Sequence, residues 1–299
     1  MSSPGRIPST RLDPGNDEVA KEGSAATMIS APQRLTALEA HPLSRLRQFT
    51  PARIALGRTG YSLPTRELLE FGVAHAMARD AVNAPFDIAA ISKQLTAAQL
   101  SFIQVSSAAV DRPTYLRRPD LGRKLDAASR SKLSSLELPA QPEVIFIVAD
   151  GLSALAPQCY AVKVIQATRY LLQDWKIGPI VLAERARVAI GDEVGEILKA
   201  EIAVMLIGER PGLSSPDSLG IYLTYAPRIG RTDAERNCIS NVRVAGMSPE
   251  LAAQTLCQLL VNARRLKLSG VLLKDESHQG MPSFAREKNP SAQRQLKSD

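Results

Sequence analysis

The residues best placed to do chemistry in this sequence follow a run of apolar residues. Ile202 to Ile207 are all apolar, which predicts a strand buried on both faces. A turn rich in glycine and proline follows at 208–212, with Glu209 and Arg210 at its tip. Because open α/β sheets bind ligands just past the ends of their strands, this turn predicts a binding site. An ion pair between Glu209 and Arg210 that only shapes the turn remains an alternative.

A second candidate group is the thiol of Cys238, which follows a polar loop at 230–237. A thiol becomes a nucleophile when a base or a cation lowers its pKa. No histidine lies near Cys238 in the sequence, so a thiol in a pocket or in the core is favoured over a nucleophile. The chain also lacks a GxGxxG after its first predicted buried strand, a phosphate-binding GxxxxGK[ST] and an evident Ser-His-Asp set. The sequence therefore indicates a binding site without a clear catalytic group.

Buried strands separated by helices must position these groups. Apolar runs predict strands at 144–149, 180–183 and 202–207, with helical periodicity between them. This alternation is typical of an α/β fold with a parallel sheet and crossover helices. Three further elements are predicted downstream: a strand at 221–225, a helix that begins after Ser248, and a short strand at 271–273.

The chain before Leu138 has a different, helical pattern. A helix that begins near Pro64 is predicted to bury one face, formed by Leu68, Phe71, His75, Ala78 and Val82. His75 is therefore interpreted as a core histidine and not as a ligand. The pattern divides the chain into a leader predicted to be disordered (1–32), a mainly helical N-terminal region (33–137), an α/β domain (138–277) and a tail predicted to be disordered (278–299).

Composition argues against several classes of protein. Hydrophobic residues make up 44% and charged residues 22%, as in ordinary globular domains, and no apolar run approaches the roughly 20 residues that span a bilayer. The first residues lack the apolar segment of a secretory signal, and three cysteines without a CxxC indicate neither a disulfide framework nor a zinc site. These features favour the cytoplasm. The net charge of +7 is spread along the chain with only 4% aromatic residues, which favours an acidic partner chain or solvated charge over nucleic acid.

Several blocks of the sequence resemble the light chain of ethanolamine ammonia-lyase. The most specific are LIGERPGL (206–213) and GRTDAERNCISN (230–241). The others are DGLSALA (150–156), RVAIGDEVGEIL (187–198), YLTYAPR (222–228) and SGVLLKDES (269–277), together with GRTG and YLRRPDLGR upstream. The resemblance covers about residues 33–277, which leaves the leader and the tail after Ser277 outside it.

The resemblance implies a light subunit of an adenosylcobalamin-dependent lyase that converts 2-aminoethanol to acetaldehyde and ammonia. In this family a TIM-barrel heavy chain holds the substrate and the catalytic residues. The light chain joins a helical N-terminal region to a Rossmann-like domain that covers the cobalamin. The family's cobalamin contacts fall on Val188, Glu209 and Cys238 of this sequence. The implied partner is the heavy chain in a hetero-oligomer, and a bacterial microcompartment is an alternative location within the cytoplasm.

Two other classes of function stay open at this point. One is a stand-alone enzyme that binds a nucleotide on a Rossmann-like domain. The other is a cobalamin carrier without catalytic activity, which would bind cobalamin tightly without associating with a heavy chain.

Overall fold

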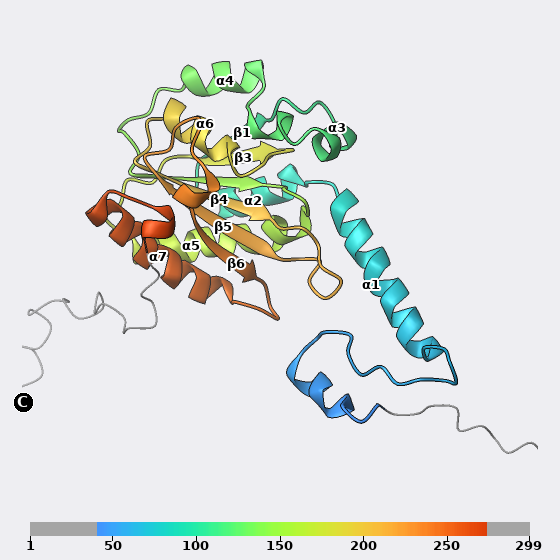
Figure 1. Cartoon of the computed structure of the whole chain (residues 1–299). Coiled ribbons are helices and arrows are strands. Elements are labelled where there is room, and N and C mark those ends of the chain that lie inside the picture. The colour runs from blue at the N-terminus through green and yellow to red at the C-terminus, as the bar shows by residue number, and fades with distance from the viewer. Residues whose placement is uncertain (1–40, 274–299) are drawn as a thin grey trace, which may run out of the picture.

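The computed structural model describes residues 41–273 of the chain, so the predicted leader at 1–32 and tail at 278–299 lie outside the described residues. Its centre is a six-stranded mixed sheet with the strand order β1-β3-β2-β4-β5-β6 and helices on both faces (Figure 1). The strands are β1 (Phe102–Ser106), β2 (Val144–Ala149), β3 (Ile180–Glu184), β4 (Ile202–Gly208), β5 (Leu219–Tyr225) and β6 (Asn237–Val242). The α-helices are α1 (Thr65–Asn83), α2 (Ile88–Ala97), α3 (Arg112–Arg117), α4 (Ala127–Ser134), α5 (Val162–Leu171), α6 (Ile190–Ile197) and α7 (Pro249–Leu266).

The three predicted buried strands form the parallel centre of the sheet. Strand β2 lies between β3 and β4 and runs parallel to both. Every residue of β2 and β4 is buried, which explains why both appear in the sequence as unbroken apolar runs. The α/β prediction is confirmed for this part of the sheet.

The sheet also takes an edge strand from the region predicted to be mainly helical. Strand β1 pairs with β3 in parallel, from Phe102 opposite Ile180 to Ser106 opposite Glu184. Only Val105 is fully buried in this five-residue strand. Such a short and half-exposed edge strand has a weak sequence pattern, and we did not predict it.

The last two strands make the sheet mixed. Strand β5 is antiparallel to β4, and β6 is antiparallel to β5. As a result Cys238 pairs with Tyr222, which itself pairs with Met205 in the middle of β4. Cys238 therefore lies halfway along the sheet and not at the carboxyl edge of the parallel strands.

The predicted short strand at 271–273 is wrong, because Gly270–Leu272 form a single 3-10 turn, η5. The side-chain amide of Asn237 donates to the carbonyl oxygens of Gly270 and Leu273 at 3.2 and 2.8 Å. Its oxygen accepts from the backbone N–H of Gly270 at 2.7 Å. These bonds close the segment into a turn, and Leu272 is exposed.

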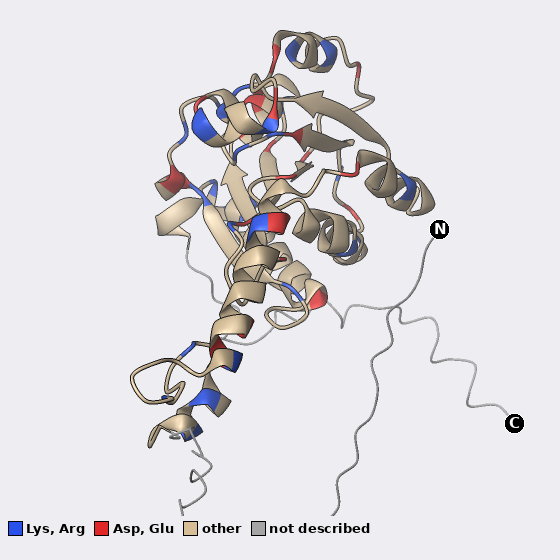
Figure 2. Cartoon of the chain, turned by 90° about the vertical axis from the view of Figure 1, so that its right-hand side faces the viewer, with Lys and Arg blue, Asp and Glu red and all other residues tan. Residues whose placement is uncertain are grey.

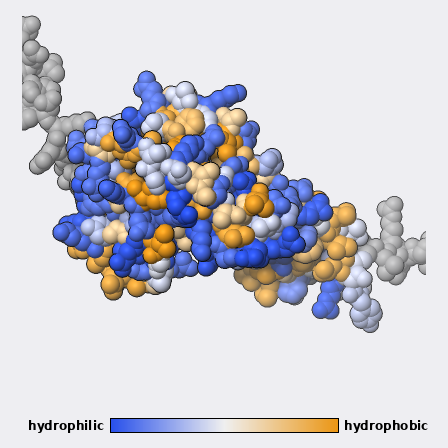
Figure 3. All heavy atoms as spheres, turned by 90° about the horizontal axis from the view of Figure 1, so that it is seen from above, coloured by the Kyte–Doolittle hydropathy of each residue, from blue (hydrophilic) through white to orange (hydrophobic). Residues whose placement is uncertain are grey.

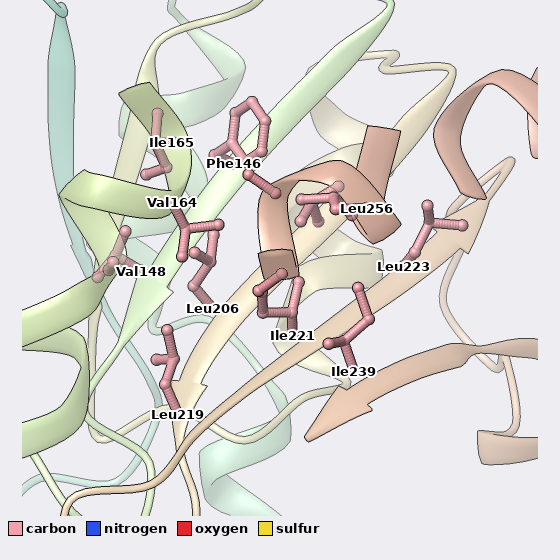
Figure 4. Packing of buried hydrophobic residues seen from close by; sticks show 14 of the residues in the cluster. Phe146, Val148, Val164, Ile165, Leu206, Leu219, Ile221, Leu223, Ile239 and Leu256 are labelled. Carbon is pink, nitrogen blue, oxygen red and sulfur yellow. The ribbon is translucent and has the colours of Figure 1, made fainter. Parts of the chain in front are cut away.

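Buried apolar residues form one layer on each face of the sheet. On one face, α5 and α7 cover Phe146, Leu206 and Ile221, and Figure 4 shows Ile165 and Leu256 packed among them. On the other face, α6 and α4 cover a second layer that includes the side chains of β2, β3 and β4 pointing that way. Helix α7 begins at the predicted place, where the Ser248 hydroxyl accepts from the backbone of the first turn.

Helix α1 forms as predicted, but its predicted buried face is wrong. Leu68 and Phe71 are 58% and 43% exposed, and His75 is exposed as well, so His75 is not a core histidine. The helix projects away from the sheet, as Figures 1 and 2 show from two directions. Periodicity places these side chains on a helix but does not say whether another element covers them, and within residues 41–273 none does. None of the described helices combines the length and the apolar character needed to cross a bilayer.

Candidate functional site

The three predicted contact residues come from different parts of the sheet. Val188 lies in the loop between β3 and α6, Glu209 follows β4 directly, and Cys238 is the second residue of β6. Val188 packs against the buried layer on the face covered by α6. Tyr222, the partner of Cys238 in β5, packs against the same layer. The structure therefore places Val188 and the paired residues Tyr222 and Cys238 on one side of the sheet. Val188 follows β3 and Glu209 follows β4, and strand β2 lies between these two strands.

The turn after β4 directs the Glu209 carboxylate over β5. The backbone N–H of Glu209 donates to the carbonyl oxygen of Ser218 at 2.9 Å, and the Ser218 hydroxyl donates to its Oε2. A Cβ at position 220 would lie 2.9 Å from Oε1 of Glu209, so Gly220 is what leaves room for the carboxylate. The alternative of an ion pair between Glu209 and Arg210 is not borne out, because no such pair forms in the described part of the chain.

Tyr222 joins the two predicted polar groups, and sequence reasoning missed it. A Cβ at position 220 would lie 3.1 Å from Cε2 of Tyr222, so the ring flanks the space that the Glu209 carboxylate occupies. On its other side Tyr222 pairs with Cys238, and the two side chains hydrogen-bond. The alternation of side chains along β5 places residues 220, 222 and 224 on one face, which is the signal that could have identified this tyrosine. We call Glu209, Tyr222 and Cys238 the polar cluster.

The polar cluster changes the acidity of its own members. Although Cys238 is partly exposed, partial burial of its thiol raises the pKa of this group. A hydrogen bond from Tyr222 opposes this shift, and the charge of Glu209 raises the pKa further. Burial also raises the pKa of Tyr222, and the neighbouring Cys238 and Glu209 add to the effect. A thiol with a raised pKa is a weak nucleophile at neutral pH, so the raised pKa disfavours a nucleophilic role for Cys238.

Alkylation of Cys238 should therefore follow a pH profile whose midpoint lies above that of a free cysteine. Glu209→Gln removes a negative charge that disfavours the thiolate, so it should move the midpoint to lower pH. Tyr222→Phe removes a hydrogen bond that favours the thiolate, so it should move the midpoint to higher pH. Iodoacetamide rates measured in a Cys159→Ser background would test both shifts, since Cys159 is exposed and burial raises the pKa of Cys257 to about 12. Unchanged midpoints in both variants would show that the three groups do not interact.

A buried ion pair holds β6 against α6. The guanidinium of Arg236 donates to both carboxylate oxygens of Asp192, at 2.6 and 2.7 Å, and both side chains are almost completely buried. Arg236 also donates to the Thr224 hydroxyl at 3.0 Å and to the Arg231 carbonyl oxygen at 2.9 Å. Because Arg236 comes two residues before Cys238, this pair determines where β6 begins. The arginine of the ERNCISN block thus has a positioning role.

A second buried carboxylate fixes the loop that leads to Val188. Asp150 follows β2 and accepts from the backbone N–H groups of Gly151 and Ala186, at 2.9 and 3.1 Å, and from Arg112 at 3.1 Å. Burial raises the pKa of Asp150, while the hydrogen bond from Ala186 and the charge of Arg112 oppose that shift. The DGLS block therefore ties the end of β2 to the loop after β3, and its carboxylate has a structural role.

The YLRRPDLGR segment supports the same loop from outside. Arg187, which precedes Val188, donates its backbone N–H to the Gly122 carbonyl oxygen at 2.8 Å. Its guanidinium lies over the Tyr115 ring, 4.4 Å from the ring centroid. Within the segment, Arg118 pairs with Asp120 at 2.8 Å. This segment positions Val188 through its neighbour.

The fold and the site define an α/β protein that presents a carboxylate, a phenol and a thiol on one face of its sheet. Residues 41–273 contain no group of three or more His, Cys, Asp and Glu side chains arranged to hold a metal ion. The groups of the polar cluster can accept and donate hydrogen bonds to a ligand that covers them, which is the chemistry of a binding subunit.

Comparison with known proteins identifies the family. The profile of the ethanolamine ammonia-lyase light chain family (EutC) matches residues 40–274. The ethanolamine ammonia-lyase small subunits of Pseudomonas aeruginosa and Pseudomonas fluorescens are each 54% identical to this chain over 241 residues, which cover 79% of this chain and 88% of theirs. The small subunit of Ralstonia nicotianae is 54% identical over 239 residues.

The chain belongs to the ethanolamine ammonia-lyase light chain family. Its function is that of the small subunit of this lyase, an enzyme of ethanolamine catabolism. The name small subunit implies a large-subunit partner.

Proposed function

We propose that this chain binds adenosylcobalamin through Val188, Glu209 and Cys238 while the large subunit carries the substrate and the catalytic residues. The observation that supports this best is the position of the polar cluster. It lies on the α6 side of the sheet, at strands β5 and β6, where part of the sheet surface is exposed. Cys238 and Ser240 are exposed there, and Gly220 leaves room for the Glu209 carboxylate beside the Tyr222 ring.

The residues of this face fit a corrin ring. The ring is broad and apolar and carries amide side chains at its edge, so it needs an open surface with a few hydrogen-bonding groups around it. Glu209 can accept from an amide N–H, and the phenol oxygen of Tyr222 can accept from another. Val188 offers an apolar contact on the same side of the sheet. When bound, the cofactor supplies the radical chemistry, and the protein supplies binding and orientation.

The partner in this proposal is the heavy chain in a hetero-oligomer. The basic balance of the chain suits an acidic partner surface. We place the assembly in the cytoplasm, with a bacterial microcompartment as the alternative location.

Reconstitution tests the division of labour. The isolated chain with adenosylcobalamin should release no ammonia from ethanolamine, and turnover should appear when the large subunit is added. Ammonia release by this chain alone would contradict the proposal and favour a stand-alone enzyme. Tight binding of cobalamin by a chain that does not associate with the large subunit would favour the carrier function instead.

Glu209 should contribute measurably to cofactor affinity in the assembled enzyme. Glu209→Gln keeps the shape and one acceptor oxygen, so a loss of about 1–2 kcal/mol is expected, which corresponds to a rise in Kd of roughly tenfold. Glu209→Ala removes the acceptor and should cost about 2–3 kcal/mol. Titration of adenosylcobalamin into complexes that carry each variant would measure both effects.

The matched control for Glu209 is Arg210→Gln. Arg210 is the next residue in the same turn and is exposed. If it lies outside the cofactor site, its substitution should leave the Kd unchanged. A lowered melting temperature with an unchanged Kd for both Glu209 variants would mean that Glu209 only shapes the turn.

A further inference from the structure

The segment 41–83, which we call the arm, exposes most of its large apolar side chains. It contains helix α1 and the 3-10 turn η1 (Ser44–Phe49), and only Pro64 and Ala81 are buried in it. Phe49 is 78% exposed, and Tyr61 is fully exposed. Figure 3 shows apolar residues gathered at the end of the molecule where the arm lies. An arm without a core of its own needs another surface to bury these side chains.

Helix α1 is apolar on more than one side. Leu69, Val73 and Met77 recur every four residues along one side, and they are 64%, 60% and 54% exposed. Leu68 and Phe71 lie on a different side and are also exposed. Figure 2 shows no charged residue between those near the two ends of this helix. The two turns between Glu70 and Arg79 are therefore apolar on more than one side. Such a stretch is normally enclosed by neighbouring protein, and not merely laid on a surface along one stripe.

One side of α1 forms a groove with the loop that begins at Glu209. Its lining is mostly apolar, with Leu69, Val73, Ala74 and Met77 from the helix and Leu213 and Pro216 from the loop between β4 and β5, and it includes two polar residues, Glu70 and Ser214. The surface of the arm is therefore continuous with the loop that begins at Glu209, the carboxylate of the polar cluster. A partner that fills the groove contacts this loop as well.

A salt-bridged arginine anchors the arm at its C-terminal end. Arg112 donates to the carbonyl oxygen of Val82, at the end of α1, at 2.8 Å. The same guanidinium donates to Asp150 at 3.1 Å and to the Gly151 carbonyl oxygen at 2.7 Å. The arm is thus tied to the edge of the sheet that leads to Val188 and Glu209.

We propose that the arm is the docking element for the large subunit, which encloses α1 and fills the groove beside residues 209–218. This inference rests on the proposed function. The relatives that match this chain are named small subunits, so a larger chain is the partner that the family supplies. The arm carries six arginines and three acidic residues, which favours a partner surface that is apolar with an acidic rim. The same excess of positive charge disfavours a second copy of this chain, because two arms facing each other would repel.

Paired substitutions of exposed residues test the arm. Leu69→Glu with Val73→Glu places two carboxylates in the groove without disturbing a buried residue. The affinity for the large subunit should fall by about 100-fold or more, since charge in the centre of an apolar interface removes its anchor residues. The control is Val271→Glu with Leu272→Glu, two residues that are 76% exposed in η5, and it should bind as the unchanged chain does. Both variants should melt at the temperature of the unchanged chain, and association is measured by titration calorimetry with the purified large subunit.

The outcomes separate the two levels of the proposal. If the unchanged chain does not bind the large subunit, the proposed function fails, and this inference fails with it. If the unchanged chain and the arm variant bind with equal affinity, the proposed function stands and the arm is not the docking element. If the isolated chain forms dimers that the arm variant abolishes while binding of the large subunit is retained, the occupant is a second copy, and the inference is overturned.

Discussion

Arg236→Ala should lower the free energy of unfolding by about 3–5 kcal/mol, because it leaves the Asp192 carboxylate buried without its partner. The two side chains are 2% and 3% exposed, so water cannot replace the lost hydrogen bonds. The substitution also removes the bonds to the Thr224 hydroxyl and to the Arg231 carbonyl oxygen. Chemical denaturation followed by circular dichroism would measure the loss.

A double substitution separates the cost of a broken pair from the value of the pair itself. Arg236→Met with Asp192→Leu replaces both charges by apolar groups of similar volume, which in other proteins is often neutral or stabilising. We therefore expect the double variant to recover much of the stability lost by Arg236→Ala. If Arg236→Ala alone costs less than about 1 kcal/mol, the pair is not the clamp that holds β6 to α6.

Gly208→Ala should be the most damaging small substitution near the site, with an expected loss of about 3 kcal/mol. An added Cβ would lie 1.8 Å from the Ser153 carbonyl oxygen and 2.6 Å from that of Asp150. Both atoms belong to the backbone, so the end of β4 and the turn after β2 must move apart. Because Glu209 is the next residue, affinity for the cofactor in the assembled enzyme should fall together with stability.

The matched control for Gly208 is Gly72→Ala in the exposed helix α1. A Cβ at position 72 meets no atom within 4 Å. Alanine is a better helix former than glycine, so this variant should be more stable by about 0.5–1 kcal/mol. Thermal melting of the two variants beside the unchanged chain would check the opposite signs. Equal and small effects at both positions would show that the turn after β2 does not pack against Gly208 in solution.

Prediction from sequence failed for two short segments that are largely exposed. Strand β1 has a single fully buried residue, and it was missed for that reason. The segment 271–273 has three apolar residues in a row but forms a turn, because Asn237 takes up its backbone hydrogen bonds. The local sequence pattern shows how apolar a segment is. Whether the segment forms a strand depends on the elements that pack against it in the fold.

The candidate site shows the same division. The resemblance to the family supplied Val188, Glu209 and Cys238, and the positions of Val188 and Glu209 after buried strands follow from apolar runs alone. Tyr222 and Gly220 emerged only with the register of β5 against β6, since nothing in the sequence states which residue lies opposite Cys238. That register is what makes three separate residues a cluster.

By itself the sequence determined the parallel centre of the sheet, the helix that begins at Ser248 and the family of the chain, because these depend on long apolar runs, a local cap and specific motifs. Only the tertiary structure decided the antiparallel pairing of β5 and β6, the contact between Asp192 and Arg236 and the exposure of α1. The first two join residues that are distant in the chain, and the choice among such pairings rests on the packing of the whole sheet. The exposure of α1 depends on which surfaces are available to cover it, and that information lies outside the helix's own sequence.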